Sequence, residues 1–280
     1  YRSHRRRVPG QTHPAVFHRF VLHPLKEKTM KKFTNARIYR NHDEASEILV
    51  DKGIIKQIGK SLPRADEEID LQGRLVVPPY VDPHLHLDYV YTGSGEGAAN
   101  KSGTLFEGIA RWHDVKKTQT LEDARERALK GIQEEVSKGV QFIRTHIDVD
   151  DPKLTGLKAM LEIREQLKDN VTIQIVAFPQ EGMYAYKGGD EMVEEALKMG
   201  ADCVGSIPHF EWAREIGEKS VHRTVELAVK YDKLIDVHCD ETDDIMSRFV
   251  ELLNALVMTE GIGTRTAASH TCSFGSADNA

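Results

Sequence analysis

Two histidines separated by a single residue, His84 and His86, are the first sign of chemistry in this sequence. They close an apolar, β-branched run over residues 75–87 that has the character of an inner β-strand. Because side chains two residues apart in a strand point to the same side, both imidazoles would face one point. Neutral imidazoles on a rigid strand suit zinc or iron. The pair predicts half of a metal site, with two hydrogen-bonded core histidines as the alternative.

A second strand end, LIDVHCDE, supplies further candidates. His238 is expected to be a third metal ligand, and Glu241 follows where the chain would leave the strand. A carboxylate there can take a proton from a metal-activated water and pass it to a substrate. The alternative is a solvated acidic loop, since residues 242–244 are polar and are expected to cap a helix. Cys239 alternates with His238 and is expected to be a small core residue.

Other strand ends carry weaker signals. His270, in ASHT, is placed to hydrogen-bond an attacking water and a developing oxyanion, and Gln180, in AFPQEG, is placed over the mouth of the site. An amide can donate to one ring atom and accept from its neighbour. His146 and His209 also stand near strand ends, where core packing explains each as well as function does. Two-metal barrel hydrolases often carry a bridging lysine after the third or fourth strand, and its absence here favours one metal ion.

These residues fall at the ends of alternating strand-like and helix-like runs. Apolar runs of strand character occupy 75–87, 140–149, 171–179, 202–210, 233–240 and 264–271. Between them, apolar residues recur at three-to-four spacing over 121–139, 154–167, 189–200, 219–232 and 243–261. Such alternation predicts parallel βαβ units, and barrel active sites form at the carboxyl ends of the strands. We expect an α/β fold, a (β/α)8 TIM-type barrel of which about six βα units are present. The alternative, a doubly wound open sheet, would carry a Gly-rich phosphate loop that this sequence lacks.

Composition and charge exclude several classes of partner. The 280 residues are 40% hydrophobic and 29% charged, with a net charge of −6, which is ordinary for a globular enzyme and unfavourable for binding nucleic acid. No apolar run approaches the roughly 20 residues of a membrane span. Three widely spaced cysteines form no disulfide framework or zinc pattern, which favours a reducing cytoplasm.

The N-terminal part differs from the rest. Residues 1–29 are rich in Arg, His and Pro and contain one acid, Glu27. They lack the apolar core of a secretory signal, although an Arg-rich, acid-poor segment can mimic a transit peptide. We expect a non-native or disordered leader there, with Met30 as the true start. Residues 30–75 then show short strands separated by Gly, Asn and Asp, which predict a small sheet ahead of a barrel over 76–280.

Taken together, VVPPYVDPHLHLD, SGTLFEGIARW, QIVAFPQEG, IPHFE, LIDVHCDE and ASHT resemble the bacterial cytosine deaminase branch of the amidohydrolase superfamily. The resemblance runs from about Phe33 to the end of the chain. It implies a β-sandwich flanking the barrel, to which residues 30–75 would contribute the N-terminal part. It also implies one divalent metal ion per chain, Fe²⁺ or Zn²⁺. Family members often form homo-oligomers.

The resemblance assigns a role to each candidate. The metal ligands would be His84, His86 and His238. Glu241 matches the proton-shuttling acid, and His270 matches the histidine beside the hydrolytic water. Two residues would bind the substrate: Gln180 would grip the pyrimidine amide, and the main-chain carbonyl of Leu105 would face the ring. The family's remaining ligand, an Asp on the eighth strand, would lie beyond Ala280, so we expect a truncated chain that is weakly active or inactive.

The implied reaction is the hydrolytic deamination of cytosine to uracil and ammonia by a metal-activated hydroxide. The expected partner is therefore a small nucleobase or similar heterocycle. Three alternatives stay open. One is a related enzyme acting on an aminated triazine, isocytosine, isoguanine or creatinine. The second is a two-metal cyclic amidase such as dihydroorotase or hydantoinase. The third is a non-catalytic barrel, against which the retention of Glu241 argues.

Overall fold

A computed structural model describes residues 30–39, 41–94 and 98–276, with only the backbone described for 41–45. The leader predicted at residues 1–29 lies outside the described residues. The chain divides into two compact units between Pro78 and Pro79. Of the helices that the structure describes, none combines the length and the apolar composition of a membrane span.

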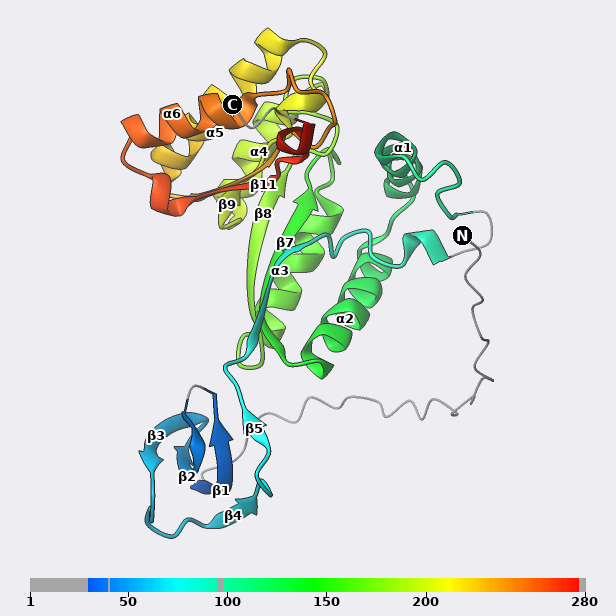
Figure 1. Ribbon diagram of the computed structural model, residues 1–280. Coiled ribbons are helices and arrows are strands. Elements are labelled where there is room, and N and C mark those ends of the chain that lie inside the picture. Colours follow the sequence, from blue (N-terminus) through cyan, green and yellow to red (C-terminus); the bar gives the residue numbers. More distant parts are fainter. Residues whose placement is uncertain (1–29, 40, 95–97, 277–280) are drawn as a thin grey trace, which may run out of the picture. The chain divides into compact units, whose positions relative to one another are not determined.

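The first unit is a small sheet, as the strand-rich segment predicts (Figure 1). Its strands are β1 (Lys31–Ile38), β2 (Asn41–Asp51), β3 (Ile54–Gly59), β4 (Glu67–Asp70) and β5 (Leu75–Val76). The order is β3-β2-β1-β4, and β5 also pairs with β1. Between β2 and β3, Lys52 and Gly53 both have positive φ, 51° and 75°, as a tight two-residue hairpin requires.

The second unit is built on a parallel six-stranded sheet in the order β11-β10-β9-β8-β7-β6. The strands are β6 (Tyr80–Leu85), β7 (Val140–Asp148), β8 (Thr172–Phe178), β9 (Cys203–Val204), β10 (Leu234–Cys239) and β11 (Thr266–His270). All pairings between neighbours are parallel. This sheet of consecutive parallel strands is the predicted partial barrel.

Helices connect these strands. They are α1 (Leu105–Lys116), α2 (Leu121–Ser137), α3 (Thr155–Leu167), α4 (Gly189–Met199), α5 (Arg214–Tyr231) and α6 (Phe249–Thr259). Short 3-10 turns lie at η1 (Thr92–Ser94), η2 (Pro208–Phe210), η3 (Gly263–Arg265) and η4 (Cys272–Ser276). In Figure 1, α2 and α3 lie beside β7 and β8. Strand residues such as Ile175 and Val237 share one buried core with helix residues such as Leu157 and Leu227.

Two predicted strands have different bounds in the structure. The run over 75–87 is not one strand: β5 pairs in the small sheet, and β6 begins the large one. Pro78 and Pro79 separate them because proline has no N–H to continue a ladder. The strand predicted at 202–210 reduces to β9, after which the backbone continues to η2.

The helix predicted over 243–261 begins later, at Phe249, and residues 242–244 do not cap it. Asp240 does so instead. Its Oδ1 accepts hydrogen bonds from the Phe249 N–H at 3.0 Å and the Ser247 hydroxyl at 2.6 Å, and its Oδ2 accepts from the Val250 N–H at 2.9 Å. A fully buried carboxylate therefore satisfies the first turn of α6, while residues 243–246 stay exposed.

Candidate functional site

Five histidines gather at the carboxyl ends of four strands. His84 lies near the end of β6 and His86 just after it, and the others follow in chain order: His146 on β7, His238 on β10 and His270 at the end of β11. Neighbouring ring centroids are between 4.2 and 5.3 Å apart. Parallel pairing brings these strand ends to one edge of the sheet, as the sequence pattern predicts.

The ring nitrogens converge as metal ligands would. His86 Nε2 lies 3.2 Å from His238 Nε2, and two ligands about 2.0–2.1 Å from a tetrahedral zinc ion would stand about 3.3 Å apart. Two sets of histidines bring their nitrogens within 4.8 Å of one another: His84 with His86 and His146, and His84 with His238 and His270. Among the described residues, several of these buried nitrogens have no hydrogen-bond partner: His84 Nε2, His86 Nδ1, His238 Nδ1 and both nitrogens of His146. Each of the two sets could hold a divalent ion; both contain His84, while the predicted ligands His86 and His238 fall in different sets.

The histidines are in the charge state that ligation requires. Burial, together with the neighbouring His146 and His270, lowers the pKa of His84 to about 4. Burial also lowers the pKa of His86 and of His238 well below the ordinary value. All three imidazoles are consequently neutral near pH 7, with lone pairs available to a metal.

Glu241 and His270 lie together beside this cluster. Glu241 Oε1 is 3.7 Å from His270 Nδ1, and burial raises the pKa of Glu241. His270 has a left-handed backbone with φ of 72°, as does Asp240 with φ of 57°, conformations that non-glycine residues adopt at an energetic cost. Glu241 follows the end of β10 and His270 ends β11, so both side chains lie at the carboxyl edge of the sheet.

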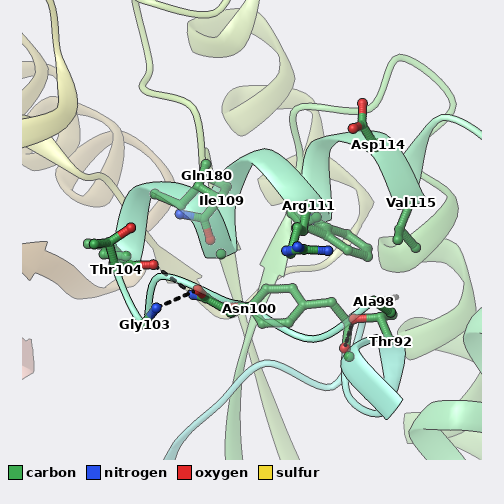
Figure 2. Close-up of a pocket in the computed structure, with 15 residues that line it drawn as sticks. Thr92, Ala98, Asn100, Gly103, Thr104, Ile109, Arg111, Asp114, Val115 and Gln180 are labelled. Carbon is green, nitrogen blue, oxygen red and sulfur yellow. Dashed lines mark hydrogen bonds between the residues drawn. The ribbon is translucent and has the colours of Figure 1, made fainter. Parts of the chain in front are cut away.

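Gln180 and Leu105 share a cavity of about 590 Å³. Tyr89 and Trp112 contribute aromatic walls to it. Figure 2 shows the Gln180 side chain next to α1, close to the loop that carries Asn100. Leu105 also lines a neighbouring cavity of about 550 Å³, to which Glu241 contributes. The first residue of α1 thus stands between the amide of Gln180 and the carboxylate of Glu241.

Sequence reasoning missed helix α1 and the buried lysine that holds it. Lys116 Nζ lies 3.0 Å from Asp148 Oδ2, at the end of β7, and 2.6 Å from Glu181 Oε1, after β8. Trp112 Nε1 donates to the same Asp148 oxygen at 2.6 Å. A sequence signal was present, since Thr104 accepts from the Glu107 N–H in the pattern of a helix N-cap, and Trp112 and Lys116 share one buried face.

Two further acids, Asp88 and Asp150, extend this network around Asp148 and Glu181. Asp88 Oδ2 accepts from the Asp148 N–H at 2.7 Å, and Asp150 Oδ2 accepts from the Glu181 N–H at 2.6 Å. Burial and the nearby Asp148 raise the pKa of Asp88 to about 7. Burial alone would raise the pKa of Glu181, but hydrogen bonds from Lys116 and His113 outweigh it and lower that pKa. The network joins α1 to the loop that carries Gln180.

His146 and His209, for which the sequence favoured neither packing nor function, have different surroundings. His146 is fully buried at the centre of the cluster, with Nε2 3.4 Å from Asp236 Oδ1. His209 lines the same cavity as Glu241, and burial lowers the pKa of its imidazole to about 4. Cys239 is buried in the core, as predicted.

A sequence model described as amidohydrolase family matches residues 67–280. Among solved structures, 5-methylcytosine deaminase from Klebsiella pneumoniae liganded with 5-fluorocytosine is similar at 47% identity and a TM-score of 0.83. That likeness covers 89% of this chain and 60% of the other. The structure of N-isopropylammelide isopropylaminohydrolase from Burkholderia multivorans has 29% identity and a TM-score of 0.75, covering 90% of this chain and 63% of the other.

A curated relative extends this comparison. N-isopropylammelide isopropyl amidohydrolase of Pseudomonas sp. (strain ADP) is 29% identical over 237 residues, which are 82% of this chain and 58% of that protein. The chain thus spans about three fifths of the length of these relatives.

Proposed function

Because this chain belongs to the amidohydrolase family, we propose that it is a metal-dependent deaminase that removes the exocyclic amino group of cytosine or a close amino-heterocycle. The observation that carries the proposal is the convergence of His86 Nε2 and His238 Nε2 at 3.2 Å, with Glu241 and His270 beside them. The likeness to a cytosine-type deaminase at 47% identity supports the ring class.

The metal ligands in this proposal are His84, His86 and His238, with Fe²⁺ or Zn²⁺ as the ion. The ion, when bound, supplies a water molecule of lowered pKa, about 7 in the case of zinc. The imidazoles are neutral, and His86 Nε2 and His238 Nε2 lie 3.2 Å apart, as two ligands of one ion would.

Glu241 carries the proton transfers. It takes a proton from the attacking water and gives it to the ring nitrogen. It then takes the remaining proton of the added hydroxyl group and gives it to the leaving amine, so that ammonia departs and the ring carbon keeps the carbonyl of uracil. Its raised pKa suits this role, because the carboxyl group can hold a proton closer to neutral pH. His270, 3.7 Å away, orients the attacking water and donates to the developing oxyanion.

Gln180 and Leu105 set the orientation of the ring. The amide of Gln180 donates to one atom of a cis-amide edge and accepts from the next, and the carbonyl of Leu105 accepts from a ring N–H. The cavity they share has aromatic walls in Tyr89 and Trp112, which suit a flat heterocycle.

The test is ammonia release from cytosine by the zinc- or iron-loaded chain and by its Glu241→Gln variant. We expect metal-dependent release that falls roughly 100-fold or more in the variant, with metal still bound. Glu251→Gln is the matched control, because Glu251 is half exposed and pairs with Arg248 at 2.6 Å, away from the site. Equal metal-dependent release by Glu241→Gln and wild type, or a wild-type chain that binds no metal, would contradict the proposal.

A second candidate is a hydrolase of aminated triazines. Two observations favour it: the 29% identity to N-isopropylammelide isopropyl amidohydrolase and the fold match to its Burkholderia counterpart. The same histidines and Glu241 would serve both reactions. Parallel assays with cytosine, 5-methylcytosine and N-isopropylammelide distinguish the two, since the preferred ring is the one with the highest kcat/KM.

A further inference from the structure

A chain of polar contacts runs from Arg144 to His84 across four strands. Arg144 Nη1, on β7, donates to Asp236 Oδ2, on β10, at 2.8 Å. Ser269 Oγ, on β11, donates to Asp236 Oδ1 at 2.7 Å. His84 Nδ1, on β6, lies 3.3 Å from Ser269 Oγ. The proposed function uses His84 as a ligand and leaves the other three residues without a role.

The direction of each hydrogen bond follows from the number of protons present. The guanidinium of Arg144 keeps Asp236 an ionised acceptor, and the side chain of Asp236 is only 2% exposed. Ser269 has one hydroxyl proton, and the short contact to a carboxylate takes it. The serine oxygen can then only accept a hydrogen bond, and His84 Nδ1 is the group in reach.

A neutral imidazole carries one ring proton, so a proton on Nδ1 leaves Nε2 with its lone pair. His84 Nε2 is buried and has no hydrogen-bond partner within the described part of the chain. We propose that Arg144, Asp236 and Ser269 act as positioning residues that hold His84 in the Nδ1–H tautomer, so that Nε2 is presented to the metal. The inference deepens the proposed function, on which the identity of the ligand rests.

The hydrogen-bonded chain from Arg144 through Asp236 and Ser269 to His84, called the relay below, has a consequence for metal binding. The hydrogen bond made by one ring nitrogen decides which nitrogen is free to bind a metal. Without the serine oxygen, the ring proton can move to Nε2 and block the lone pair. Removing a residue that is hydrogen-bonded to a metal ligand typically lowers metal affinity about 10- to 100-fold. Asp236 Oδ1 also faces His146 Nε2 at 3.4 Å, so a variant at Ser269 isolates the relay better than one at Asp236.

The first measurement is zinc affinity by competition with a chromogenic chelator. Ser269→Ala removes the hydroxyl, and Ser269→Thr retains one. Ser137→Ala is the matched control, because that hydroxyl donates to the Glu134 carbonyl on the exposed side of α2. We expect affinity to fall about 10- to 100-fold in Ser269→Ala and to stay close to wild type in Ser269→Thr and Ser137→Ala. Wild-type affinity in a folded Ser269→Ala protein would overturn the proposal.

The second measurement reads the tautomer directly. Histidine ¹⁵N NMR of the metal-free protein near pH 7 is expected to show the proton of His84 on Nδ1, and to show it redistributed in Ser269→Ala. A proton on Nε2 of His84 in the wild type would refute the relay. This readout needs neither metal nor turnover, so a failure of the relay is distinguishable from a failure of the proposed function, which would appear as wild-type protein that binds no metal.

Discussion

Replacing Lys116 by methionine tests how α1 is held beside the candidate site. The lysine side chain is 6% exposed, and its two partners, Asp148 and Glu181, are 1% and 18% exposed. The substitution keeps the volume of the side chain and leaves the buried Asp148 without its lysine partner. Removing one partner of a buried ion pair typically costs about 3–5 kcal/mol. Because Trp112 still donates to Asp148, we expect the free energy of unfolding to fall by about 3 kcal/mol, the lower end of that range.

Urea unfolding followed by circular dichroism measures this loss. In a domain of this size about 3 kcal/mol corresponds to roughly 6–12 °C in Tm. Lys168→Met is the matched control, since Lys168 and Glu165 are 60% and 74% exposed and such surface pairs contribute about 1 kcal/mol or less. Under the proposed function, Lys116→Met should also bind a cytosine analogue more weakly, because α1 carries Leu105. Equal unfolding midpoints for the two variants would refute the reasoning.

The same variant has an expected pH dependence. Lys116 and His113 lower the pKa of Glu181 against the opposing effect of burial. A depressed carboxyl pKa contributes stability above its ordinary value of 4.5, and this contribution is lost as pH falls through the folded-state pKa. The difference between wild type and Lys116→Met should therefore shrink as pH falls below about 4.

Two further predictions concern buried aspartates. Asp240→Ala removes three hydrogen bonds at the start of α6 and should cost about 2–3 kcal/mol in urea unfolding; a loss below about 0.5 kcal/mol would show that the cap is dispensable. Burial and Asp148 raise the pKa of Asp88 to about 7, so the folded state binds an extra proton between about pH 4 and 7. The contribution of Asp88 to the free energy of unfolding should therefore fall by roughly 4 kcal/mol as pH rises across that interval. Asp88→Asn should flatten this part of the profile, and an unchanged slope would contradict the raised pKa.

The gathering of the candidate metal-ligating histidines was predictable because their sequence signal is local. His84 and His86 are one residue apart at the end of an apolar run, and His238 repeats the pattern on a later strand. The rule that parallel strands end at one edge then brings them together. The match to the amidohydrolase family and the 47% identity to 5-methylcytosine deaminase confirm the resemblance to the cytosine deaminase branch. The individual roles of these residues, the identity of the metal and an oligomeric assembly stay predictions.

What the sequence did not predict depends on contacts between distant residues. Lysine side chains are mostly exposed in proteins, and the burial of Lys116 follows only from its ion pairs with Asp148 and Glu181. The cap of α6 is Asp240, nine residues before the first helical N–H it accepts, so no local capping pattern reveals it. The central position of His146 likewise depends on the pairing of β7 with its neighbours, which leaves this imidazole fully buried among the other rings.

The most direct test of the central claim is a crystal structure of zinc-loaded protein with anomalous diffraction at the zinc edge. The account predicts one zinc ion per chain, bound by His86 Nε2 and His238 Nε2, which stand 3.2 Å apart, together with Nε2 of His84. Loss of the anomalous zinc peak in crystals of the His238→Ala variant would support the assignment. A protein that crystallises without zinc at this point, or that binds zinc with other residues, would contradict it.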